Sequence, residues 1–99
     1  MNIQNMMKQA QQLQREMTNI KEEINNTVFP GKSSMVEVSV NGKKEVLKVQ
    51  IDKDMDLTKD DMEMLEDMIV VAMNDAFKKV DEMTDQKMSK FGPGVSGLL

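Results

Sequence analysis

Five of the six acidic residues from Asp52 to Glu63 form the pattern in this chain that most resembles a metal-binding site. They stand at positions 1, 3, 5, 9 and 12 of a twelve-residue window, positions that supply side-chain ligands in an EF-hand calcium loop. Position 6 of such a loop needs glycine for a sharp turn, and here it is Leu57. The residues before the window alternate like a strand, whereas an EF-hand loop follows a helix. We therefore predict a strand-to-helix connection with solvated acids and no metal site, neither calcium nor zinc.

The composition of the 99 residues excludes most other kinds of chemistry. The chain has no cysteine and no histidine, which removes thiolate nucleophiles, zinc-cysteine sites and the usual general base. It has no tryptophan or tyrosine and only three phenylalanines, too few to stack sugars or single-stranded bases. We expect a binding protein rather than an enzyme, with no cofactor and no small-molecule substrate.

Basic side chains are the remaining candidates for a functional surface. Lys8 and Arg15 are seven residues apart and share one face of a predicted helix, where a cation is free to reach a phosphate. Four more lysines follow Ala76, and they are Lys78, Lys79, Lys87 and Lys90. These six cations are the candidate phosphate contacts.

An ordinary structural role competes with that interpretation. Asp75 with Lys79, and Lys78 with Glu82, have the i,i+4 spacing of helical ion pairs, and lysines near a helix end complement its dipole. The net charge of −4 also repels DNA at long range. Spacing alone therefore favours the structural role for the four later lysines.

A helical repeat opens the chain. From Ile3 to Ile24, apolar residues recur in steps of three and four, with polar residues between them. The apolar stripe is narrow, with Leu13 and Ile20 at d positions of a heptad, so it predicts a coiled-coil contact of about three heptads. Lys8 and Arg15 fall at f positions, away from that contact.

A β-hairpin is predicted in the middle of the chain. Residues 26–34 interrupt the helical period with Pro30-Gly31, and residues 27–29 before that turn suit a short strand. Two apolar triplets then alternate with polar residues, Val36, Val38 and Val40 followed by Leu47, Val49 and Ile51. Asn41-Gly42 suits the positive φ angles of a type I′ turn, and either a two- or a four-residue loop puts both triplets on one face.

A second, longer helix is predicted from the capping-box sequence at Thr58 to about Lys90. Residues 91–99 hold three glycines and a proline and predict a flexible tail, which leaves residues 1–90 as one domain. The fold class is α+β, with a long N-terminal helix, a short antiparallel sheet built on the hairpin and a long C-terminal helix. We find no secretory signal and no run apolar enough for a membrane span, and so expect a cytoplasmic protein without a membrane partner.

The apolar positions amount to more surface than one chain of this length covers. We assign nine of them to the core or to a dimer interface, namely Leu13, Ile20, Val38, Val40, Val49, Ile51, Leu65, Ile69 and Met73. The chain is therefore expected to form an obligate homodimer.

Three segments resemble the YbaB/EbfC family of bacterial nucleoid-associated proteins. Residues 6–14 are similar to that family's first helix, and residues 38–42 with 49–52 to its hairpin. The most specific segment is residues 63–76, EMLEDMIVVAMNDA. The resemblance implies a homodimer with joined sheets and helices that project as two arms, double-stranded DNA held by those arms, and nucleoid-associated roles in nucleoid organisation, DNA protection and regulation of gene expression. It supplies no DNA contact residues, so the six cations are physical choices.

A rival interpretation stays open. A helix, hairpin and helix with twelve methionines also resembles the subunit plan of prefoldin-type holdases, whose arms grip unfolded protein. A salt-sensitive shift of duplex DNA would favour the DNA-binding interpretation. Suppression of client aggregation at stoichiometric dose would favour the holdase.

Overall fold

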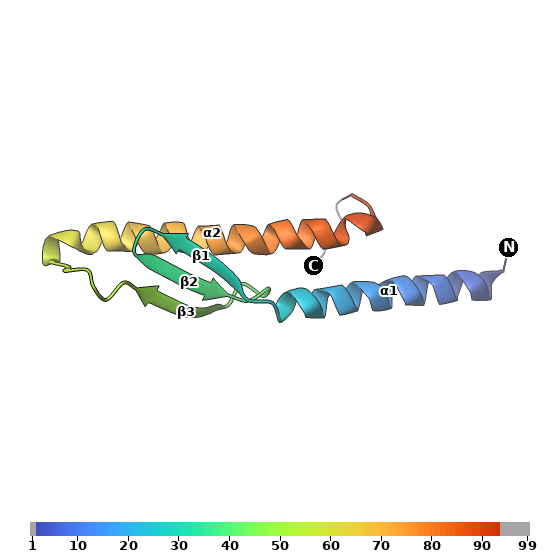
Figure 1. Cartoon of the computed structure of the whole chain (residues 1–99). Helices are drawn as coiled ribbons and strands as arrows, with labels where there is room; N and C mark the ends of the chain where they lie inside the picture. The colour runs from blue at the N-terminus through green and yellow to red at the C-terminus, as the bar shows by residue number, and fades with distance from the viewer. Residues whose placement is uncertain (1, 94–99) are drawn as a thin grey trace.

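Two long helices flank a three-stranded antiparallel sheet in the part of the chain that the computed structural model describes, residues 2–93 (Figure 1). In chain order the elements are α1 (Ile3–Asn25), β1 (Phe29–Ser33), β2 (Val36–Val40), β3 (Val46–Ile51) and α2 (Met62–Met88), with single 3-10 turns at Lys59–Asp61 and Ser89–Phe91. This order confirms the predicted α+β class. Most of the predicted tail, residues 94–99, lies outside the described residues.

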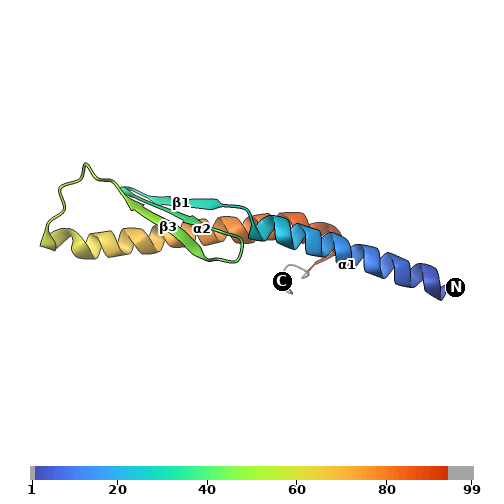
Figure 2. The same ribbon diagram turned by 90° about the horizontal axis from the view of Figure 1, so that it is seen from below.

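The shape is elongated because only the C-terminal part of α1 lies against α2. The described chain measures 71 × 21 × 14 Å and has a radius of gyration of 19.3 Å, against about 13 Å for a compact domain of this length. The Asn2 side chain caps α1 by accepting hydrogen bonds from the backbone N–H groups of Gln4 and Asn5. Residues 3–15, here called the arm, are exposed throughout and extend beyond the end of α2 (Figure 1, Figure 2).

Strand β1 occupies the place where the sequence pattern predicted a turn. We expected a strand over residues 27–29 that ended at Pro30-Gly31, and that prediction is wrong. The strand runs through both residues, and the chain turns at Ser34, whose φ is +50°. Pro30 is tolerated because β1 is an edge strand in the order β1-β2-β3, where a missing N–H needs no partner.

The core lies between α2 and one face of β1 and β2. Eight buried residues form it, namely Ile24, Phe29, Val36, Val38, Val40, Ala72, Ala76 and Val80. A Cβ added at Gly31 would clash with the Ala72 carbonyl oxygen and lie 2.7 Å from the Ala76 backbone nitrogen. Glycine and two alanines therefore allow β1 to lie directly on the backbone of α2.

The hairpin loop between β2 and β3 differs from the predicted type I′ turn. The positive φ falls on Lys44, at +60°, and not on Asn41 or Gly42. The Asn41 side-chain oxygen accepts hydrogen bonds from the backbone N–H groups of Lys43 and Glu45 at 2.9 and 3.0 Å. Gly42 is needed for space, because a Cβ there would clash with the Ile24 carbonyl oxygen at the end of α1.

Strand β3 is left uncovered by α2, although its apolar residues continue the buried face of β2. Val36 pairs with Ile51 and Val38 with Val49, as the alternation predicted. Leu47 is the extra residue of a bulge opposite Val40. Since α2 contacts only β1 and β2, the described chain presents β3 as an open edge beside an uncovered apolar face.

Two of the nine residues predicted for the core or the dimer interface are exposed in the single chain. Leu13 in the arm is 51% exposed and Val49 on β3 is 44% exposed, because α2 reaches neither of them. The single chain therefore does not bury these two residues, and their place in a dimer interface stays a prediction. Val38 and Val40 are buried as predicted. The other five are half-buried: Ile20, Ile51, Leu65, Ile69 and Met73.

Asp75 ties β1 to α2 at the rim of the core. Its carboxylate accepts a hydrogen bond from the Lys32 backbone N–H at 3.1 Å and lies 3.4 Å from Lys79 Nζ, which donates to the Pro30 carbonyl oxygen at 2.9 Å. The hydrogen bond from the Lys32 backbone is the largest effect on the pKa of Asp75 and lowers it from its ordinary value of 3.8. Desolvation opposes this shift in pKa, and the hydrogen bond and charge of Lys79, with the charge of Lys78, add to the lowering.

This lowered pKa predicts a pH-dependent contribution to stability. The folded chain binds the Asp75 proton less tightly than the unfolded chain, so the contribution is complete well above 3.8 and is lost as pH falls through the lower, folded-state pKa. We expect Asp75→Asn to flatten the acid side of the stability profile in urea denaturation from neutral pH to about pH 3. Asp85→Asn, which removes a carboxylate without an ion pair among residues 2–93, is the control and should keep the wild-type profile. Equal profiles for Asp75→Asn and wild type would contradict this role.

Candidate functional site

Two of the acids that resemble a calcium loop accept hydrogen bonds from nearby backbone N–H groups in the structure. The Asp52 side chain accepts a hydrogen bond from the Asp54 N–H at 3.0 Å, and the Asp61 carboxylate accepts one from the Thr58 N–H at 2.9 Å. The second contact is the reach-back bond of the predicted capping box. Within residues 2–93, no group of three or more acids is arranged to hold a metal ion.

These acids also make one end of the molecule negatively charged, whereas the rest of the chain is slightly positive. Residues 52–67, here called the acidic tip, hold eight acids and two lysines, whereas the rest of the chain holds eleven bases and nine acids. The tip includes the start of α2, at the end of the molecule opposite the arm (Figure 1). Asp60, Glu63 and Asp67 line a shallow hollow there. A polyanion is therefore repelled at the tip and tolerated nearer the arm.

Two of the six predicted DNA contacts, Lys8 and Arg15, lie on the arm. Both are exposed, and neither forms an ion pair within the described residues. They are therefore available to phosphate without the loss of an internal contact.

Lys78 and Lys79 form the two helical ion pairs that their spacing predicted. Lys78 lies 4.0 Å from Glu82 and is 75% exposed, so its pair is weak and its charge stays accessible. Lys79 lies 3.4 Å from Asp75 and is also bonded to the Pro30 carbonyl oxygen. Of these two adjacent lysines, Lys79 is thus held at the sheet and Lys78 is the freer cation.

Lys87 and Lys90 hold α1 to the end of α2. Lys87 Nζ lies 2.9 Å from the Glu23 carboxylate, and Lys90 Nζ lies 3.8 Å from that of Glu16. Lys90 also stands 5.1 Å from the centre of the Phe91 ring. Sequence spacing did not reveal these pairs, because their acids lie on the other helix. For either lysine to contact phosphate, it must exchange a carboxylate partner.

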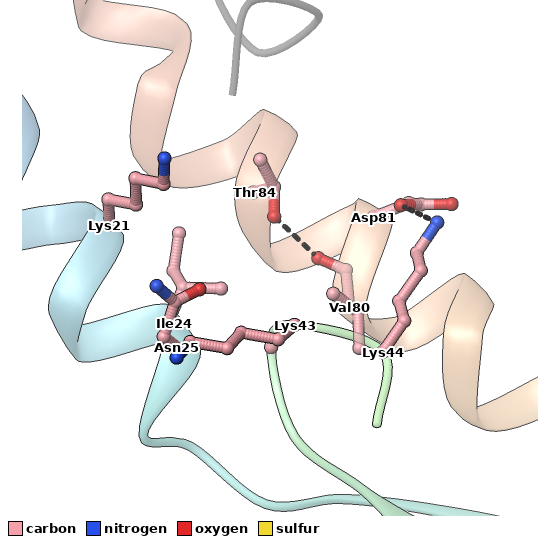
Figure 3. Close-up of a pocket in the computed structure, with 9 residues that line it drawn as sticks. Lys21, Ile24, Asn25, Lys43, Lys44, Val80, Asp81 and Thr84 are labelled. Carbon is pink, nitrogen blue, oxygen red and sulfur yellow. Dashed lines mark hydrogen bonds and ion pairs between the residues drawn. The ribbon is translucent and has the colours of Figure 1, made fainter. Parts of the chain in front are cut away.

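Three further lysines, Lys21, Lys43 and Lys44, line a pocket that sequence reasoning missed, with their side chains directed to different sides of it (Figure 3). This junction pocket has a volume of about 510 Å³ and lies where the end of α1, the hairpin loop and α2 come together. Its lining residues are Lys21, Ile24, Asn25, Gly42, Lys43, Lys44, Val80, Asp81 and Thr84. The adjacent pair Lys43-Lys44 is visible in the sequence, but only the fold brings Lys21 to it.

Comparison with known proteins then decides the family. A model of the YbaB/EbfC DNA-binding family matches residues 1–95. The chain belongs to that family. Its members bind DNA and are not enzymes, which confirms both the resemblance in the sequence and the prediction of a binding protein.

Relatives of this YbaB/EbfC chain match it from end to end. It is 42% identical over 97 residues to a nucleoid-associated protein of Lactococcus lactis subsp. cremoris strain MG1363, covering 96% of this chain and 97% of the relative. It is 38% identical over 100 residues to one from Ligilactobacillus salivarius strain UCC118, covering 99% and 95%. The crystal structure of an uncharacterised Helicobacter pylori protein is similar with a TM-score of 0.72 and 26% identity, over 93% of this chain and 99% of that one.

The fold separates the accessible positive charges of this chain from its main cluster of negative charge. Accessible cations lie on the arm and at the junction pocket, and negative charge gathers at the acidic tip. No helix among residues 2–93 is both long enough and apolar enough to cross a membrane.

Proposed function

We propose that this chain binds double-stranded DNA as a homodimer and acts on the bacterial nucleoid, in the cytoplasm, in nucleoid organisation, DNA protection and regulation of gene expression. The observation that carries the proposal is the match of residues 1–95 to a DNA-binding family, together with relatives named nucleoid-associated proteins. Residues 1–90 act as one domain in this proposal, with residues 91–99 as a tail.

The homodimer is supported by surface that the single chain leaves open. Exposed apolar side chains cluster on β3, where Val46, Leu47 and Val49 are each more than two-fifths exposed. The edge of β1 contains Pro30, which cannot donate to another strand, whereas β3 offers six residues without such a block. Sheets joined through β3 would cover this edge and its apolar face.

The DNA surface is proposed on the arm half of each chain. The arm carries Lys8 and Arg15, which form no ion pair within residues 2–93. Carboxylates lie beside the four later lysines, which are Lys78, Lys79 and Lys87 on α2 and Lys90 just after it. These side chains address phosphate more than base edges, so sequence preference is weak. If about four to six phosphates are neutralised per dimer, log K falls against log salt with a slope of about −4 to −5.

Removal of the two arm cations tests this surface. We expect Lys8→Gln with Arg15→Gln to flatten that slope by as much as about 4, because each charge occurs twice in a dimer. Both side chains are exposed, so unfolding free energy should change by less than about 0.5 kcal/mol for each. The measurement is a titration of labelled duplex with purified protein over a salt series.

A matched control removes the same charge from the acidic tip. Lys53→Gln with Lys59→Gln, here called the tip control, should leave the slope nearly unchanged, because eight acids surround those lysines. An unchanged slope in the folded arm variant would move the DNA surface to the α2 lysines or remove the arm model. Stoichiometric suppression of client aggregation without any duplex binding would instead support the holdase.

A further inference from the structure

Positive charge outweighs negative charge around the junction pocket. Its lining includes Lys21, Lys43 and Lys44 but one acid, Asp81. Asp81 pairs with Lys44 at 2.9 Å, and neither Lys21 nor Lys43 forms an ion pair within residues 2–93. In a chain with a net charge of −4, this concentration of cations in a partly apolar recess attracts an anion.

Lys44 holds a backbone conformation that disfavours its residue type. Its φ of +60° belongs to the left-handed region, which glycine or asparagine adopts at lower cost. Despite this backbone cost, the position is occupied by a lysine that lines the pocket and pairs with Asp81. Strained residues of this kind concentrate at binding sites, where the surrounding structure maintains them.

The loop that carries Lys43 and Lys44 is already ordered. Its turn is closed by hydrogen bonds to the Asn41 side-chain oxygen, and Gly42 rests against the Ile24 carbonyl oxygen. In Figure 3 the Lys43 side chain extends toward Asn25 at the end of α1, whereas Lys44 reaches across to Asp81 on α2. An anion entering here meets backbone that needs no further ordering, which lowers the entropic cost of binding.

We infer that the junction pocket binds backbone phosphates of DNA, and that Lys21, Lys43 and Lys44 form a second contact zone at the base of the arm. The inference rests on the proposed function, since it extends the DNA surface from the arm toward the sheet. Lysine Nζ groups donate hydrogen bonds to phosphate oxygens as point charges, without reading base edges. Asp81 holds Lys44 in the free protein, and an entering phosphate competes with that carboxylate.

Charge removal at the pocket gives the first test. The pocket contacts steepen the wild-type slope beyond the value of about −4 to −5 expected from the arm half alone. In the duplex titration over a salt series, we expect Lys21→Gln with Lys43→Gln to reduce that steepness by about 2 to 4, because four charges are lost per dimer. The tip control removes equal charge and should change the slope by less than about 1. A pocket variant that behaves as the tip control, while wild type binds duplex, overturns the inference and leaves the proposed function intact.

Replacement of the strained lysine separates binding from folding. Lys44→Gly relieves the positive φ, so its melting temperature should equal or exceed that of wild type while duplex binding weakens. A fall in melting temperature with unchanged duplex affinity would mean that Lys44 serves only the fold, and would overturn the inference. If wild type itself shows no salt-dependent duplex binding, the proposed function fails, whatever the variants do.

Inorganic pyrophosphate distinguishes DNA phosphate from a small free phosphate. At matched ionic strength, we expect it to compete weakly with duplex for wild type. Pyrophosphate could instead raise the melting temperature of wild type but not that of Lys21→Gln with Lys43→Gln. If duplex binding were also the same in both proteins, the pocket would be assigned to a small phosphate and the inference would be overturned.

Discussion

Gly31→Ala is expected to destabilise the chain by about 3 kcal/mol, because the added methyl group meets backbone that cannot move aside. Its Cβ would clash with the Ala72 carbonyl oxygen and lie 2.7 Å from the Ala76 backbone nitrogen. Relief requires β1 to separate from α2, and that separation opens the contact that buries Phe29. A loss of this size lowers the melting temperature by roughly 12 to 24 °C in a domain of this length.

Lys32→Ala is the matched control for that change. Lys32 follows Gly31 on the same strand but points to the exposed face, and its backbone N–H to Asp75 is kept. Its unfolding free energy should change by less than about 0.5 kcal/mol. Equal melting temperatures for Gly31→Ala and Lys32→Ala would show that β1 does not rest on α2 as closely as described.

Val49→Lys is expected to convert the proposed dimer to monomer or to unfolded chain. Val49 stands in the middle of β3 on the uncovered apolar face, and a lysine there would place two unpaired charges in the joined sheet. At about 3 kcal/mol for each buried unpaired charge, the two charges raise the dissociation constant by at least about ten-thousandfold. Light scattering at micromolar concentration, with circular dichroism for folding, measures both outcomes.

Gln50→Lys adds the same charge one residue further along β3. Gln50 pairs with Glu37 on the polar face of the sheet, so this control should remain dimeric. A dimeric Val49→Lys variant would exclude β3 as the interface. A wild-type chain that is folded and monomeric at micromolar concentration would refute the dimer itself.

The elements of the fold were predictable where one periodicity runs without interruption. The steps of three and four from Ile3 to Ile24 and the alternation of Val36, Val38 and Val40 gave α1 and β2 directly. Strand β1 was misplaced because Pro30-Gly31 is a turn signal in local sequence. Its role as an edge strand lying on two alanines is a tertiary property, and so is the need for Gly42 beside Ile24.

The candidate site was less predictable than the fold, because its charges depend on partners distant in sequence. Spacing predicted the pairs of Lys78 and Lys79 within α2, but Glu23 lies 64 residues from Lys87. Lys43 and Lys44 were not predicted as site residues, because only the fold brings Lys21 to the same pocket. Exposure of Leu13 and Val49 likewise depends on how far α2 reaches, which no local pattern encodes.

Gly42 couples the arm mechanically to the sheet. The carbonyl of Ile24 lies so close to Gly42 that the loop has no room for a side chain there, and a rotation of α1 about its C-terminal end would bring it against the turn that carries Lys43 and Lys44. With 23 residues, α1 is about 35 Å long, and this contact lies at its C-terminal end. In the proposed complex, a bent or looped duplex that pulls on the arm would load this contact with the hairpin loop, together with the ion pairs of Lys87 with Glu23 and Lys90 with Glu16.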